Sequence, residues 1–190
     1  MQKIFLSLFL LTLIACSPTV TRMNPDTQMD LSGRWNDTDS RMVADQMILD
    51  LVNSDGFKNY AKTIGRKPVI IVGSIRNKTS EHIDADNYIK KFEVVIHNSG
   101  MAELVENDAF RDKLRTERAS QQDFASPSTA ASWGEETGAD LMLFGEMNAE
   151  TDTARKKRVV NYMTTLFLTD IETNKRIWYG QREIKKLVKN

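Results

Sequence analysis

The sequence predicts one α/β domain (α+β), in which a small mixed β-sheet is flanked by helices and ends in a long antiparallel hairpin. Apolar residues recur at helical spacing in the first half of the chain, and a continuous aliphatic run at 69–72 is typical of a buried strand. Near the end, two segments alternate apolar and polar residues around a polar turn. Helices interspersed with early strands and followed by a hairpin favour a mixed sheet in one layered domain.

The composition is that of a single ordinary globular domain. The 190 residues include 26 Lys and Arg against 26 Asp and Glu, and 41% are hydrophobic. A chain of this length buries about two-thirds of its unfolded surface, so it needs neither disulfides nor a structural metal. A single cysteine excludes an intramolecular disulfide. Because phosphate binding requires an excess of Lys and Arg, we expect no nucleic-acid partner.

The N-terminus has the pattern of an export signal. Lys3 gives a cationic start, and Ile4 to Ile14 form an almost wholly apolar run. This run is too short to cross about 30 Å of hydrocarbon as a helix, so a retained transmembrane anchor is the weaker interpretation. The run ends in Leu13-Ile14-Ala15-Cys16, which resembles the lipobox of bacterial lipoproteins. We therefore interpret residues 1–15 as a lipoprotein signal peptide.

Cys16 is the expected lipidation site. The lipobox resemblance implies that its thiol receives diacylglycerol and that its amine, as the mature N-terminus, takes an acyl chain such as palmitate; we expect no other cofactor. Several acyl chains hold a protein on one leaflet without spanning it. Ser17-Pro18 lacks the Asp that resembles an inner-membrane retention signal, so we expect the periplasmic face of the outer membrane. The alternative is that Cys16 is a small apolar residue beside an ordinary cleavage site.

A short tether is expected to join this cysteine to the domain. Residues 16–31 comprise the lipidated cysteine and a polar segment with two of the four prolines and no helical or strand period. Fully extended, the segment reaches at most about 50 Å. We expect residues 32–190 to form a single globular domain that acts as a monomer. Removal of Lys3 with the signal leaves 25 basic and 26 acidic residues, a net charge of −1.

The first half of the domain predicts two helices and a strand between them. A helix is expected over 37–54, with an N-cap at 37, 38 or 39. The aliphatic run at 69–72 predicts a central strand covered on both faces. Helical spacing returns at 88–96, with Asp84 as N-cap and Gly100 as terminator, and we expect this helix to pack on the strand.

The second half predicts shorter elements before the hairpin: a strand at 102–105, a charged helix at 108–122, a short helix at 127–137 and a buried strand at 140–145. Residues 159–170 and 175–186 alternate in the manner of antiparallel strands, and 170–174 form the turn between them.

The sequence contains no recognisable catalytic motif. The two histidines, His82 and His97, do not form the HExxH motif of zinc hydrolases. There is no G-x-S-x-G elbow, no S-x-x-K, no P-loop and no G-x-G-x-x-G. Paired carboxylates such as Glu135-Glu136 could cleave a glycan, but such pairs are commoner on solvated helices. We expect a non-enzyme that binds no metal, and glycan cleavage remains the enzymatic alternative.

Six residues in polar loops are candidates for binding a partner, because recognition groups tend to lie in loops that flank secondary structure. They are Arg34, Trp35, Asp37, Arg76, Asn77 and His82. Trp35 precedes the first helix, where it can pack back as an N-terminal staple or serve as a partner hot spot. His82, beside Glu81, is either a contact or an ordinary loop residue.

The one basic run is Arg155-Lys-Lys-Arg158, which leads into a predicted strand. Such a run could attract anionic lipid headgroups or another acidic surface, or it could be a solvated loop.

Several segments resemble the LpoB-type outer-membrane lipoproteins. They are Leu31 to Arg41, Gly65 to Asn77, Glu81 to Asp84, Glu135 to Asp140 and Ile171 to Trp178. The resemblance spans about residues 31–186 and includes the lipobox. It implies a fold similar to the N-terminal domain of TolB and a non-enzymatic role as activator of a class A penicillin-binding protein, a bifunctional peptidoglycan synthase.

The resemblance also implies how such an activator works. The anchored domain would pass through the peptidoglycan mesh and dock on a small regulatory domain of the synthase, which requires only that it bind the active state better than the resting state. The tether of about fifteen residues departs from the long disordered tether of the best-known members, and limits reach. The alternative is a general envelope adaptor or assembly lipoprotein that binds another periplasmic or outer-membrane partner.

Overall fold

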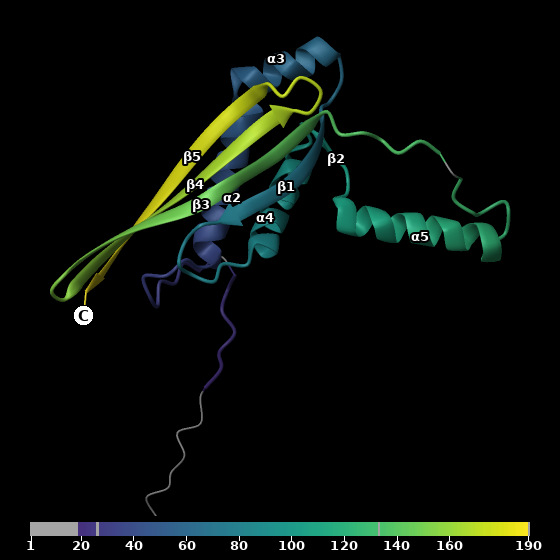
Figure 1. The fold of residues 1–190 in the computed structure, drawn as a ribbon. Coiled ribbons are helices and arrows are strands. Elements are labelled where there is room, and N and C mark those ends of the chain that lie inside the picture. Colours follow the sequence, from purple (N-terminus) through teal and green to yellow (C-terminus); the bar gives the residue numbers. More distant parts are fainter. Residues whose placement is uncertain (1–18, 26, 133, 190) are drawn as a thin grey trace, which may run out of the picture.

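The computed structural model describes residues 19–25, 27–132 and 134–189, so the expected signal peptide and Cys16 lie outside the described residues. Along this part of the chain the elements are α2 (Asp37–Asn53), α3 (Asp55–Ile64), β1 (Val69–Asn77), α4 (Ala85–Ser99), β2 (Glu103–Leu104), α5 (Asp108–Phe124), β3 (Leu141–Ala154), β4 (Lys157–Asp170) and β5 (Arg176–Lys189) (Figure 1).

The strands form one mixed sheet in the order β2-β1-β3-β4-β5. Strand β1 pairs in parallel with both β2 and β3, whereas β3, β4 and β5 are successively antiparallel. The predicted fold class is therefore confirmed, including the terminal antiparallel hairpin. The predicted burial of 69–72 is confirmed as well, because all four residues are buried.

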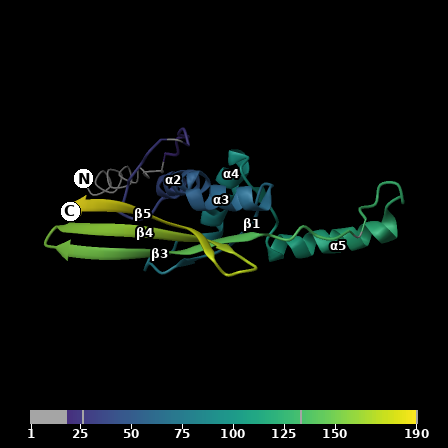
Figure 2. The ribbon, with the colours of Figure 1, turned by 90° about the horizontal axis from the view of Figure 1, so that it is seen from above.

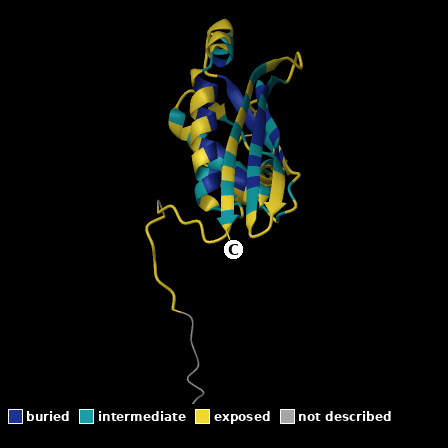
Figure 3. Ribbon diagram, turned by 90° about the vertical axis from the view of Figure 1, so that its left-hand side faces the viewer, coloured by how far each residue is buried: buried dark blue, intermediate teal, exposed yellow. Residues whose placement is uncertain are grey.

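Helices α2, α3 and α4 cover one face of the sheet, and α5 extends beyond it (Figure 2). The core fills the space between these helices and the sheet, where buried residues gather (Figure 3). Alternate residues of β4 point into this layer, among them Tyr162, Leu166 and Leu168, none of which is exposed to solvent. The other face of the sheet carries Phe144, Phe167 and Tyr179 as a row of rings that contact one another at tilted angles.

The helix ends follow their capping residues. Asp84 caps α4 by accepting from the backbone N–H groups of Asp86 and Asn87, and Gly100 ends it at φ 65°, both as predicted. The N-cap of α2 is Asn36, so the prediction that residue 37, 38 or 39 caps this helix is wrong. The Asn36 side chain accepts from Asp39 N–H, and the Asp39 carboxylate accepts from Asn36 N–H, which makes a capping box.

Three elements differ from the prediction. Helix α3 was missed, although Ser54 caps it and Gly65 ends it. The helix expected at 127–137 is wrong, because the Ser126 carbonyl closes one turn with the N–H groups of Thr129 and Ala130 and no helix follows in the described residues. Strand β3 continues past the predicted 140–145 to Ala154, since pairing with β4 satisfies its polar end.

Candidate functional site

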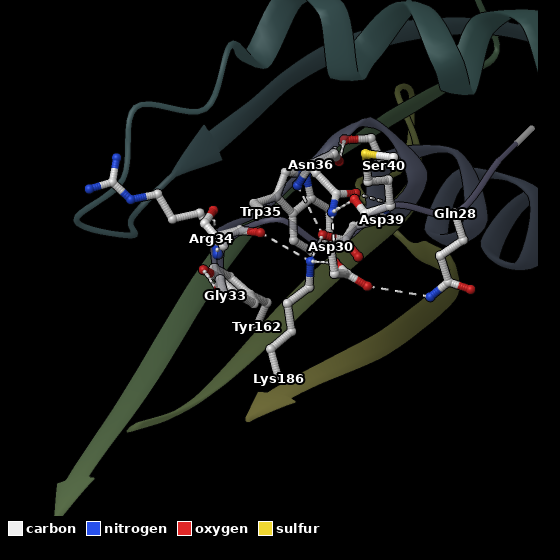
Figure 4. A network of polar contacts seen from close by, with 12 residues as sticks. Gln28, Asp30, Gly33, Arg34, Trp35, Asn36, Asp39, Ser40, Tyr162 and Lys186 are labelled. Atoms are coloured by element: carbon white, nitrogen blue, oxygen red, sulfur yellow. Dashed lines mark hydrogen bonds and ion pairs between the residues drawn. The ribbon is translucent and has the colours of Figure 1, made fainter. Parts of the chain in front are cut away.

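A partly buried lysine joins the N-terminal segment to the domain. Lys186 lies on β5, and its ammonium group contacts the Asp39 carboxylate at 2.5 Å, the Asp30 carboxylate at 2.6 Å and the Arg34 carbonyl at 3.0 Å (Figure 4). The side chains of Lys186 and Asp39 are only 9% and 5% exposed. Asn36 also donates to Asp30. This cluster, which we call the N-terminal clamp, fixes residues 30–39 against the end of β5.

The ionisation of the clamp follows from its hydrogen bonds. Burial would lower the pKa of Lys186, but hydrogen bonds to Asp30 and Asp39 outweigh it, so the pKa lies above the ordinary lysine value. The hydrogen bond from Lys186 lowers the pKa of Asp30. The ammonium therefore stays charged at neutral pH and holds the two carboxylates together.

Trp35 is fixed on the other side of the clamp. Its backbone N–H donates to Glu81 at 3.0 Å, and its indole N–H donates to the Ser40 hydroxyl at 2.7 Å. Its ring meets those of Tyr88 and Tyr162 edge-on at centroid distances of 5.8 and 5.4 Å. The Tyr162 hydroxyl in turn donates to Glu81 at 2.6 Å. Trp35 thus contacts the helix that it precedes through a hydrogen bond to Ser40, whereas its ring packs on Tyr88 of α4 and Tyr162 of β4, so the packing differs from the staple interpretation.

Two tyrosines support this aromatic cluster with hydrogen bonds. Burial, followed by the hydrogen bond to Glu81, raises the pKa of Tyr162 well above its ordinary value. Burial likewise raises the pKa of Tyr88, whose hydroxyl pairs with that of Thr164 at 3.0 Å. Both phenols are neutral at physiological pH, so they act as fixed hydrogen-bonding and packing groups.

A groove of about 730 Å³ runs between α2 and α4 beside this cluster. Trp35 and Tyr88 contribute its aromatic part, and Val94, 57% exposed, contributes an open apolar part. Charges of both signs line it, namely Arg41, Lys90, Lys91, Asp37, Asp45 and Asp84. Such a surface, apolar at the base and polar at the rim, has the composition of a protein-docking site. We call it the α2–α4 groove.

Three of the six predicted partner residues, Trp35, Asp37 and His82, line this groove. Arg34 is adjacent, with its carbonyl in the clamp and its side chain directed away from it (Figure 4). Asn77 holds the loop of residues 77–81 in place, because its side chain donates to the Glu81 carbonyl and accepts from Thr79 N–H.

Arg76 is separate from the groove. It pairs with Glu146 on the sheet face opposite the helices.

Sequence reasoning missed the clamp and the α4 side of the groove. Lys186 occupies an inward-facing position of an alternating strand, between Ile184 and Val188. A charged residue at such a position needs a partner, and this was the signal in the sequence that could have indicated the clamp. Lys90 and Val94 lie outside the apolar stripe that defined the predicted helix, so the hydrophobic periodicity did not identify them as binding residues.

The site contains no constellation for metal chemistry. In the part of the chain that the structure describes, no three His, Cys, Asp or Glu residues are grouped so that they could hold a metal ion. Over the same residues, no helix combines the length and apolarity needed to cross a bilayer. What the arrangement offers is a rigid, mixed-charge surface for binding.

Comparison with known proteins identifies the family. The model of the peptidoglycan-synthase activator LpoB family matches residues 39–184. Among solved structures, the NMR structure of Escherichia coli LpoB is 16% identical, with 94% of this chain and 85% of that chain covered and a TM-score of 0.43. The C-terminal domain of E. coli LpoB is 17% identical over 70% of this chain and 100% of its own, with a TM-score of 0.36.

A third similar structure is lipoprotein GNA1162 from Neisseria meningitidis, 12% identical over 63% of this chain and 83% of its own, with a TM-score of 0.39. A search of curated proteins finds no match. Since the family model covers most of the chain, from the first turn of α2 into β5, the protein belongs to the peptidoglycan-synthase activator LpoB family.

Proposed function

We propose that this protein activates a class A penicillin-binding protein by docking on it through the α2–α4 groove. The observation that carries the proposal is the groove itself, an open surface with an aromatic base and charged rim in a chain of the LpoB family. The activity is regulatory and not enzymatic. Docking raises the synthase rate to the extent that the groove binds the active state more tightly than the resting state.

The rigidity of the groove supports this role. Hydrogen bonds hold Trp35 by both its backbone and its indole nitrogen, and the clamp fixes the start of α2 against β5. A preorganised surface loses little conformational entropy on binding, so more of its contact energy appears as affinity. Because Trp35 also stabilises the domain, truncating it would confound binding with folding. Val94, which is exposed, is a better position to test.

Anchoring at Cys16 would place the domain at the periplasmic face of the outer membrane. From Cys16 to Asp30, where the clamp begins, the chain has 14 residues, which extend at most about 50 Å. The clamped end of the domain must therefore stay within that distance of the anchor, and the partner must reach the domain there. We propose that the domain binds as a monomer, since the groove is formed within one chain.

Binding to a purified class A synthase, measured by biolayer interferometry, tests the proposal. We expect saturable binding that Val94→Asp weakens at least tenfold, because the substitution puts a charge into the apolar part of the groove. The matched control is Leu114→Asp, at a residue that is 51% exposed on α5 and distant from the groove. It should change the affinity less than twofold.

Two outcomes would contradict the proposal. Equal losses in the two variants would mean that the groove is not the contact surface. No binding by the folded wild-type chain would favour the alternative function, an envelope adaptor that binds another periplasmic or outer-membrane partner.

A further inference from the structure

The long hairpin of β3 and β4 carries a concentration of positive charge at its tip. Arg155 and Lys156 form the turn, and Lys157 and Arg158 begin β4. The pairing of β4 with β5 brings Lys189 opposite Lys157 and places Lys185 opposite Asn161. We call these six cations, Arg155, Lys156, Lys157, Arg158, Lys185 and Lys189, the cationic tip.

The cationic tip is neutralised only in part within the described part of the chain, through the attraction between Lys185 and Glu183. None of its six side chains makes a salt bridge there, whereas cations elsewhere do, as in the pairs Arg66–Asp140 and Lys78–Glu146. Asp152 and Glu183 are the nearest acids along the strands; Glu183 accepts from Asn161 and Gln181 and attracts Lys185 without forming a salt bridge with it. Lys157 directly opposite Lys189 is a like-charge pair, which costs stability in a sheet. An external anion would relieve that repulsion.

The tip also offers an exposed aliphatic side chain. Leu187 is 54% exposed and lies between Lys185 and Lys189 on the sheet face opposite the helices. The turn itself is fully exposed, with Arg155 in the left-handed region at φ 52°. A leucine surrounded by lysines is suited to an interface between water and lipid, because the cations contact headgroups while the apolar group enters the layer below.

The N-terminal segment leaves the domain at this same end. Residues 30–33 lie against residues 185–189, and a side chain at Gly33 would collide with Val188, so the backbone there passes close to β5. In Figure 1 the hairpin tip and the segment from residue 19 onward emerge from the same end of the sheet, opposite α3. An anchor that joined the chain to a membrane before residue 19 would therefore hold the domain by the end that carries the cationic tip.

We propose that the cationic tip binds the surface of an anionic phospholipid leaflet. Each Lys or Arg at such a surface contributes about fivefold in affinity, so several together give measurable binding without an acyl chain. With an acyl anchor, the tip would be the second of two membrane signals. The exposed lysines face away from the helices, so a domain bound in this way keeps the α2–α4 groove accessible.

Vesicle co-sedimentation tests the proposal. The probe is vesicles of phosphatidylcholine alone or mixed equally with phosphatidylglycerol, and the protein is the unacylated chain of residues 17–190, which contains the whole buried core between residues 39 and 168. We expect binding to the anionic vesicles only, weakening as salt rises. The double variant Lys156→Glu/Lys157→Glu should bind at least about 25-fold more weakly.

The matched control reverses two exposed lysines at the other end of the molecule, Lys58→Glu/Lys62→Glu on α3, and changes the net charge by the same amount. It should retain most of the binding. Equal losses in the two variants, equal binding to both kinds of vesicle, or no binding by the wild-type chain would each overturn the proposal. So would binding to purified peptidoglycan, but not to vesicles, that depends on Lys156 and Lys157.

Discussion

At the scale of single residues, the stability of the N-terminal clamp depends on one partly buried cation. Removing Lys186 would leave the carboxylate of Asp39, which is 5% exposed, without its cation. Breaking a buried ion pair on one side typically costs about 3 to 5 kcal/mol, because a charge is left desolvated. We therefore expect Lys186→Met to lower the free energy of unfolding in urea by about 3 kcal/mol.

The neighbouring Lys185 provides the control for that substitution. It is exposed and makes no salt bridge to a described residue, so Lys185→Met should change the free energy of unfolding by less than about 0.5 kcal/mol. Similar losses in the two variants would show that the clamp does not stabilise the domain. Partial recovery in Lys186→Met/Asp39→Asn would confirm that the cost comes from the unpaired carboxylate.

A second charged residue, Asp140, makes the free energy of unfolding depend on pH in the acidic range. Its carboxylate accepts two hydrogen bonds from Arg66 and one from Val69 N–H, and the Arg66 bonds in particular lower its pKa. A lowered folded-state pKa gives stability that is complete above the ordinary value near 4 and is lost as the pH falls through the folded value. In acid titrations of unfolding, Asp140→Asn should flatten the decline below about pH 4. An unchanged acid slope would contradict this assignment.

At the scale of elements, α2 and α5 have the same length but contribute very differently to the stability of the domain. Eight residues of α2 are buried, whereas none of the residues of α5 is. Leu51→Ala should cost about 3 kcal/mol, because the side chain is fully buried, while Leu114→Ala should cost less than about 0.5 kcal/mol. Denaturant unfolding measures both. A cost at Leu114 near that at Leu51 would mean that α5 packs on the domain in solution.

The elements also show what the sequence could predict. Helix α4 was predicted with both ends, because a buried stripe, an Asp cap and a terminal Gly agree with one another. Helix α3, which directly follows the longer helix α2, was not predicted, although Ser54 caps its start and Gly65 ends it. The segment at 127–137 has turn formers and no apolar stripe to bury, and its described residues form only a turn. The polar end of β3 is a strand only because β4 pairs with it, and local sequence does not contain that information.

At the scale of the whole molecule, the candidate site was only partly predictable. Trp35, Asp37 and His82 were chosen as loop residues near helix starts, and the fold brings them together because α2 and α4 begin at the same end of the sheet. Arg76, chosen by the same criterion, points to the opposite sheet face. The clamp joins residues more than a hundred positions apart, and only the fold determines that contact.

The central claim is that this domain activates a peptidoglycan synthase by docking through the α2–α4 groove. The most direct measurement is glycan-chain polymerisation from lipid II by the class A synthase of the source organism, with increasing amounts of residues 17–190. We expect a several-fold, saturable increase in rate, much reduced by Val94→Asp and retained by Leu114→Asp. An unchanged rate with the folded domain at saturating concentration would contradict the account.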